Sequence, residues 1–203
     1  MKIVIKIVVF NFALFFLFMN VQAQTQPTPV PAPTPIDVRP ESAWCDKYFN
    51  EGKFEEAWKH CSGKWGSLVY TYGNAEDRTR LQQFQERKIE RLAVILSKLS
   101  KSPTIPDDAE LYEQKGIGFM EAARAPADFA LAIKEFQHAL NSAPWVFDFY
   151  FNLAMAYKAA GQFKDALNIL AHAKILAAND KDRKDVISLR AKIEVAQEMA
   201  PKK

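Results

Sequence analysis

The sequence predicts an all-α protein, built as a stack of antiparallel helical hairpins with an N-terminal helical extension and a C-terminal capping helix. The first observation behind this prediction is an internal offset. Ala132 and Ala166 are 34 residues apart, and their aromatic and alanine neighbours recur at the same offset. The second is that apolar residues keep a helical spacing through residues 107–199, with Pro144 between two copies. A period of about 34 residues with fixed aromatic and small positions is typical of stacked helix pairs.

The first 23 residues are predicted to be a secretory signal peptide. Lys2 and Lys6 give a positive start, residues 7–19 are apolar apart from Asn11, and small residues lead up to Ala23. This arrangement is typical of a segment that is cleaved during export. The alternative is an uncleaved membrane anchor, for which the run is short. We therefore expect an exported protein, periplasmic or secreted, or one anchored at its N-terminus, with no other membrane contact.

The charge of the chain argues against one class of partner. The sequence has 27 basic and 24 acidic residues, and loss of Lys2 and Lys6 with the signal would leave 25 against 24, a net charge of +1. Nucleic-acid binding requires a basic patch that such a balance does not supply. We expect protein partners and no nucleic acid.

Residues 24–40 are predicted to be an extended linker, because prolines recur there every two or three residues and prevent helix formation. Residues 41–101 are predicted to be an N-terminal helical region that begins with a degenerate hairpin over residues 41–61, broken at Gly52. The short apolar segment at residues 66–73 fits either a helix or a strand.

A longer helix is predicted to follow Asn74, an N-cap candidate with Asp77 three residues later, and to run to about Leu99. One face of this helix is apolar and the opposite face is basic. A basic helix face is most often simply solvated, and the alternative is an acidic partner or a cell-wall polymer. The basic side chains are Arg78, Arg80, Arg87, Lys88, Arg91 and Lys98.

Residues 107–199 are predicted to form the repeat domain. Asp107 and Asp108 are candidates to cap its first helix, since carboxylates accept orphan backbone N–H groups and favour the positive helix end. The last helix is amphipathic and has the character of a cap on an open apolar end. The repeats are expected at about 109–146 and 147–180, and the cap at 181–199.

The second of these repeats has the clearest pattern. Its first helix should end at Gly161, where a residue that can adopt positive φ is useful. Small residues are expected where the two helices approach each other, and large ones where gaps must be filled. The large residues are Tyr150, Leu153, Tyr157, Phe163 and Leu170, and the small ones are Ala154, Ala166 and Ala173.

These residues resemble the tetratricopeptide repeat, which has an aromatic residue, Leu-Gly/Ala, Tyr, Gly-x-Tyr/Phe and further alanines in this order. Ala178 stands where the family often has proline. The resemblance implies a scaffold that binds other proteins. In the preceding copy the second helix also fits, with Phe129, Ala132, Ile133, Phe136, Ala139, Leu140 and Pro144.

The first helix of the preceding copy departs from the pattern. Tyr112, Gly116 and Phe119 keep the mutual spacing of the family but lie four residues too early. Four residues is about one helical turn. We therefore expect residues 120–126 to lengthen the helix or its turn while keeping the helical phase.

A third, degenerate copy is predicted at the start of the folded region, and it carries both cysteines. Cys45 and Cys61 are each eight residues from Lys53, in the expected turn, so they should lie at the same height in an antiparallel hairpin. Export would place them in an oxidising compartment, which predicts a disulfide. The alternative is two small buried residues. The copy consists of Trp44, Cys45, Tyr48, Gly52, Phe54 and Ala57.

The partner-binding residues are predicted from the resemblance. In a tetratricopeptide stack the first helices form the inner, concave face, and an apolar floor with charges around it suits a peptide or a helix. Glu110, Glu113 and Asp148 argue against the capture of a C-terminal carboxylate. The alternative is that Phe151 and Met155 only pack against flanking helices. The predicted groove consists of Glu113, Ile117, Met120, Asp148, Phe151, Met155 and Lys158.

The sequence contains no motif for catalysis, for a cofactor or for a metal. His138 and His172 occupy equivalent positions in the two repeats, expected on the outer side, and stacked helices would hold them too far apart to share one ion. We expect a non-enzymatic interaction module of the bacterial cell envelope without cofactor or metal. The alternatives are a structural subunit that self-associates as a homo-oligomer, and a cell-wall or enzyme-accessory protein.

Overall fold

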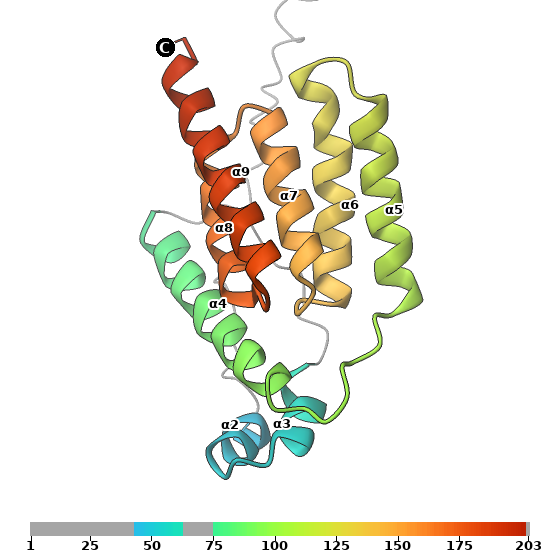
Figure 1. Cartoon of the computed structure of the whole chain (residues 1–203), viewed down its shortest axis with the longest axis vertical. Coiled ribbons are helices and arrows are strands. Elements are labelled where there is room, and N and C mark those ends of the chain that lie inside the picture. The colour runs from blue at the N-terminus through green and yellow to red at the C-terminus, as the bar shows by residue number, and fades with distance from the viewer. Residues whose placement is uncertain (1–42, 63–74, 202–203) are drawn as a thin grey trace, which may run out of the picture. The chain divides into compact units, whose positions relative to one another are not determined.

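The computed structural model describes residues 43–62 and 75–201, which fold into eight α-helices and one short 3-10 turn. The prediction of an all-α stack of antiparallel hairpins is confirmed (Figure 1). The predicted signal peptide, the predicted linker and residues 66–73 lie outside the described residues. Within the described ranges, no helix is both long enough and apolar enough to cross a membrane.

Five helices form the repeat stack, and successive helices run in alternating directions and pack on each other (Figure 1). The first helices of the hairpins are also neighbours, since α5 contacts α7 and α7 contacts α9. The five helices are α5 (Asp107–Ala122), α6 (Phe129–Ser142), α7 (Phe147–Ala159), α8 (Phe163–Leu176) and α9 (Asp180–Met199).

The core of the stack follows the predicted alternation of large and small residues. Burial of a large apolar side chain contributes about 1.5–3 kcal/mol, so these positions supply much of the stability of each hairpin. Tyr150 is fully buried, and its hydroxyl donates a hydrogen bond of 2.9 Å to the carbonyl of Pro144. The fully buried small residues include Ala132, Ala139, Ala154, Ala166 and Ala173.

The extra residues of the first hairpin lengthen both its first helix and its turn. Helix α5 has 16 residues against 13 in α7, and the 3-10 turn η1 (Pro126–Asp128) precedes α6. The Asp128 carboxylate accepts hydrogen bonds from the backbone N–H groups of Arg124 and Ala125, at 2.9 and 2.8 Å. These bonds close the turn and hold the pKa of Asp128 below its usual value.

Two equivalent ring contacts show that the lengthened helix keeps its phase. Tyr112 contacts His138 with ring centroids 5.1 Å apart, and Tyr150 contacts His172 at 5.9 Å in the next hairpin. Phe119, which keeps the family's spacing with Tyr112 and Gly116, is not buried with them, since its side chain is 36% exposed. Helix α5 is the first helix of the stack, and the two helices that pack on it, α6 and α7, both come later in the chain. No earlier hairpin of the stack therefore covers the side of α5 that carries Phe119.

The N-terminal hairpin consists of α2 (Ala43–Asn50) and α3 (Phe54–Cys61), and it turns in the same way as the second repeat. Gly52 has a φ of 70° and Gly161 a φ of 74°. The N–H of Lys53 bonds the carbonyl of Tyr48 at 2.9 Å, and a bond of the same length joins the equivalent pair in the second repeat. Both turns are therefore Schellman caps with glycine in the left-handed position.

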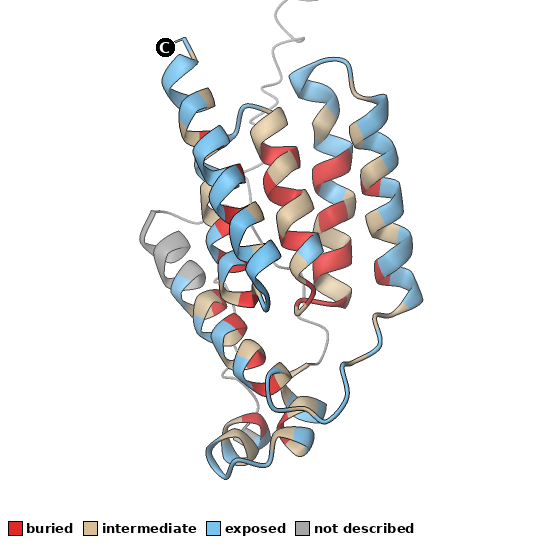
Figure 2. Cartoon of the chain, viewed as in Figure 1, coloured by how far each residue is buried: buried red, intermediate tan, exposed pale blue. Residues whose placement is uncertain are grey.

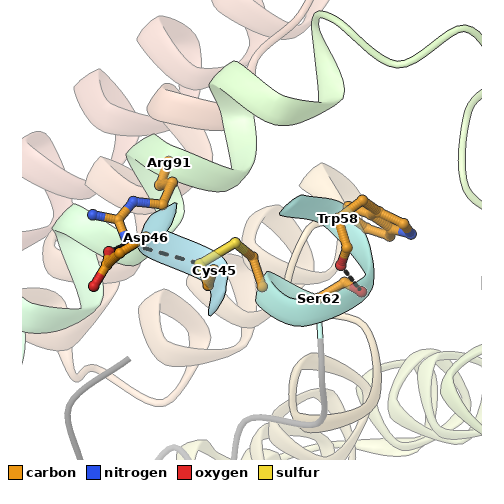
Figure 3. The surroundings of a disulfide bond; sticks show 6 residues. Cys45, Asp46, Trp58, Ser62 and Arg91 are labelled. Carbon is orange, nitrogen blue, oxygen red and sulfur yellow. Dashed lines mark hydrogen bonds and ion pairs between the residues drawn. A yellow bond between two sulfur atoms is a disulfide. The ribbon is translucent and has the colours of Figure 1, made fainter. Parts of the chain in front are cut away.

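The predicted disulfide is present and joins α2 to α3, with the Cα atoms of Cys45 and Cys61 5.1 Å apart (Figure 3). Arg91 of α4 (Ala75–Leu96) forms an ion pair with Asp46 beside the disulfide, and its guanidinium lies 5.2 Å from the centre of the Phe49 ring. Its assignment to a solvated basic face was wrong, because this side chain attaches α2 to α4.

Two predicted helix ends differ in the structure. Helix α4 ends at Leu96 and not near Leu99, and the chain beyond it is held by Ser100, whose N–H and hydroxyl both bond Glu55 of α3. Asp108 does not cap α5, because Pro106 occupies the N-cap and the Asp108 carboxylate accepts a hydrogen bond from Ser142. Both predicted capping residues still lie in the first turn, where their charges favour the helix dipole.

Replacing Gly116 by alanine should lower the free energy of unfolding by about 1–3 kcal/mol, the usual effect of overpacking a core. A Cβ atom at this position would lie 2.5 Å from the ring of Phe136, which is itself buried. Gly118 is the matched control, because an added Cβ meets nothing within 4 Å there and alanine should stabilise the helix by up to about 1 kcal/mol. Urea denaturation measures both variants, and an unchanged Gly116→Ala protein would contradict this packing.

Replacing both cysteines by alanine should lower the free energy of unfolding by about 3 kcal/mol, because the bond closes a loop between residues 16 apart in sequence. The helical content of the repeat stack should not change. Denaturation of wild-type protein with and without a reducing agent provides the control, since the reduced wild type should match the double variant. Equal midpoints for the oxidised wild type and the double variant would contradict the prediction.

Candidate functional site

All seven predicted groove residues lie on the two first helices α5 and α7. The apolar ones are half-buried and pack against the core. Each still presents part of its surface to solvent, so these side chains combine a fixed position with an accessible edge. The four apolar residues are Ile117, Met120, Phe151 and Met155.

Phe147 is an aromatic residue of this surface that the sequence reasoning missed. Its ring stacks on that of Phe151 with centroids 5.7 Å apart, and both rings are half-buried. The available signal was the spacing of four residues, which places Phe147, Phe151 and Met155 in one row along the helix. The row gives α7 an aromatic pair at its beginning and a flexible thioether in its second half.

A hydrogen bond between α5 and α7 organises the polar part of this surface. Asn152 donates to the Glu113 carboxylate at 3.0 Å. Partial burial raises the pKa of Glu113, the nearby charges of Asp148 and Glu110 raise it further, and the Asn152 bond opposes the shift. The Asn152 side chain therefore joins α7 to Glu113 of α5, and Asp148 lies near enough to Glu113 for its charge to act on that carboxyl.

We call this surface the inner face of α5 and α7. It combines the Glu113 carboxyl, whose charged form is disfavoured by burial and by neighbouring carboxylates, with aromatic and methionine side chains. Lys158 is half-buried at the other end of α7. The acidic character of the inner face near Glu113 favours a cationic ligand group, since an opposite charge would relieve the repulsion between the carboxylates. The residues of the inner face are Glu113, Ile117, Met120, Phe147, Asp148, Phe151, Asn152, Met155 and Lys158.

The two equivalent histidines do not share one environment. His138 is half-buried, whereas His172 is buried, and neither ring nitrogen of His172 has a hydrogen-bond partner in the described part of the chain. The expectation that His172 lies on an outer side was wrong, because α4 packs on α8. No cluster of three or more metal-ligating side chains occurs among the described residues.

The fold defines a class of protein, a stack of antiparallel helical hairpins. The sequence profile of the tetratricopeptide repeat family matches residues 123–193. This range covers α6, α7, α8 and most of α9. Repeats of this family are typically non-catalytic and indicate protein–protein interaction. The comparisons with curated proteins and with solved structures found no match.

Burial lowers the pKa of His172, opposed by the charge of Glu86 on α4, and this predicts an acid-sensitive fold. An unfolded histidine binds a proton below a pH of about 6.5, whereas the folded state resists protonation until its lower pKa is reached. Between these two pH values, stability should fall as pH falls, by at most about 1.4 kcal/mol per pH unit.

Replacing His172 by phenylalanine should remove this part of the pH dependence. Urea denaturation over a range of mildly acidic pH values measures it. A His138→Phe variant keeps His172 and is the control, so it should retain the wild-type dependence. A His172→Phe protein that loses stability as steeply as the wild type would contradict the assignment.

Proposed function

We propose that this protein is a non-enzymatic interaction module that holds a peptide or a helix of a partner protein on the inner face of α5 and α7. The observation that carries the proposal is that an aromatic pair and a pair of carboxylates lie on two neighbouring helices, α5 and α7. The Phe147–Phe151 stack offers a fixed aromatic surface, and the Glu113 carboxylate lies beside Asp148 with a raised pKa. Aromatic anchors and oriented charges are what peptide-binding surfaces of repeat proteins use.

The chemistry of the inner face favours a particular kind of ligand. An apolar side chain of the ligand would pack on Phe151 and Met155, and methionine adapts its shape to such contacts. A lysine or arginine of the ligand would lie near Glu113 and Asp148 and would lower the pKa of Glu113 by favouring its charged form. The proposed ligand is therefore an apolar segment with a basic residue next to it.

We further propose that the protein works in the cell envelope after export. Two features support this proposal, the signal-like N-terminal segment and the Cys45–Cys61 disulfide. Disulfides form and persist in oxidising compartments and are rare in the cytosol. Determining the N-terminal residue of the protein isolated from its cells distinguishes a cleaved signal peptide from an uncleaved N-terminal anchor.

A second candidate function is attachment to an anionic wall polymer through the basic face of α4. The structure supports it less well than peptide binding on the inner face. Arg91 is engaged with Asp46 and Phe49, and Lys88 lies over the ring of Phe84 at 5.2 Å. Arg87 and Lys98 are exposed and are the described residues on which such a role would have to depend.

A random peptide library selected on the wild-type protein tests the inner face. The selected peptides should be apolar and basic, and the Phe151→Ala, Met155→Ala double variant should bind them at least about tenfold more weakly, a loss of about 1.4 kcal/mol. The control is Leu131→Ala, because Leu131 is an exposed apolar residue on α6. Circular dichroism should show the same helical content in all variants.

The same peptides report on Glu113. Because the pKa of Glu113 is raised, its charge is lost at a higher pH than that of an ordinary glutamate, and binding of a basic peptide should weaken as pH falls through this range. A Glu113→Gln variant should bind more weakly at neutral pH and lose this pH dependence. Selected peptides that bind both variants as tightly as the wild type would count against the inner face.

A further inference from the structure

Helix α9 has a second apolar face that the stack does not cover. Its buried face consists of Val186, Leu189 and Ile193. Much of the surface of α9 is exposed (Figure 2). Four further apolar residues recur there every four positions, and among them Ile187 is 68% and Val195 54% exposed. A contiguous exposed apolar surface on a soluble protein indicates an interaction site. We call this the outer stripe of α9, and it consists of Ile187, Ala191, Val195 and Met199.

The outer stripe repeats a pattern that both complete hairpins use to receive a second helix. A large residue is followed four positions later by a small one in Tyr112 and Gly116, in Tyr150 and Ala154, and in Ile187 and Ala191. On α5 this pair is covered by α6 through His138 and Phe136, and on α7 it is covered by α8 through His172. The pair on α9 has the same spacing but is exposed, so this helix presents a large and a small residue on which an antiparallel helix can pack.

We propose that the outer stripe binds the outer stripe of a second copy, with the two α9 helices antiparallel about Ala191. Lys184 and Glu198 are each seven residues from Ala191 and are both exposed. Neither forms an ion pair within the described ranges. In the antiparallel arrangement Lys184 faces Glu198 of the partner subunit, whereas a parallel arrangement would place like charges together. The stripe is therefore self-complementary in one orientation only.

The geometry of this pair also sets its strength. A two-fold pair uses the same patch on both copies, and the small side chain of Ala191 at its centre allows the helix axes to approach to about 8–10 Å. One helix from each copy buries less than the roughly 1,200 Å² of a standard stable interface. The dimer is therefore weak and depends on concentration.

Sedimentation equilibrium of the full chain over a wide concentration range tests the proposal. The wild type should show a monomer–dimer equilibrium, and Ile187→Glu or Val195→Glu should abolish the dimer. Leu131→Glu on α6 is the matched control, because Leu131 is an apolar residue that is 53% exposed, nearly the same fraction as the 54% of Val195. All variants share the N-terminal segment, so a difference among them reports on α9. A wild type that stays monomeric, or a dimer that survives both α9 variants, would overturn the proposal.

Charge reversal tests the orientation of the pair. Lys184→Glu and Glu198→Lys should each raise the dissociation constant up to about tenfold, and the two changes together should restore it. A parallel pair would not respond in this way, because each reversal exchanges one like-charge contact for another.

Cross-linking tests the centre of the pair. Both native cysteines are joined in the disulfide, so an Ala191→Cys variant carries a single new thiol. This variant should oxidise to a covalent dimer, whereas Leu131→Cys should not. Failure of Ala191→Cys to cross-link, or association that grows beyond dimers, would indicate head-to-tail contacts and would overturn the two-fold pair.

Discussion

The close approach of paired helices at glycine and alanine is the constraint on which the rest of this structure depends. Gly116 leaves no room for a Cβ beside Phe136, and Ala154 and Ala166 are fully buried in the next hairpin. Because these positions fix how each helix is rotated about its axis, they decide which residues face the core and which remain available. The hairpins then stack through their large residues, and Tyr150 satisfies its buried hydroxyl at the loop that joins them.

That rotation creates the two surfaces for which we propose partners. Between the core positions of α5 and α7 lie the residues of the inner face, and Asn152 holds Glu113 across the two helices. On α9 the same rotation buries Val186 and turns Ile187 outward. For the acidic and aromatic inner face we propose a foreign segment as the ligand, and for the outer stripe of α9 a second copy of the chain.

The N-terminal helices cover part of the repeat stack, because α4 packs on α8 and α3 packs on α4. The disulfide and the Arg91–Asp46 pair join α2, α3 and α4 into one assembly, and α4 packs on α8. Trp58 of α3 meets Trp145 edge to face, with ring centroids 4.9 Å apart, at the start of the second hairpin. This covering explains why His172 is buried although an equivalent histidine, His138, is only half-buried.

The sequence by itself determined the features that depend on neighbouring residues. Helical phase, the glycine turns at Gly52 and Gly161, the cysteine pairing within one hairpin and the offset of the repeats all follow from spacing along the chain. Only the tertiary structure decided the burial of His172 and the exposure of Phe119. Periodicity specifies which face of a helix is apolar, but it does not specify which distant helix covers that face. That choice depends on long-range packing, so the environment of the inner face and the exposure of α9 could be known only from the folded chain.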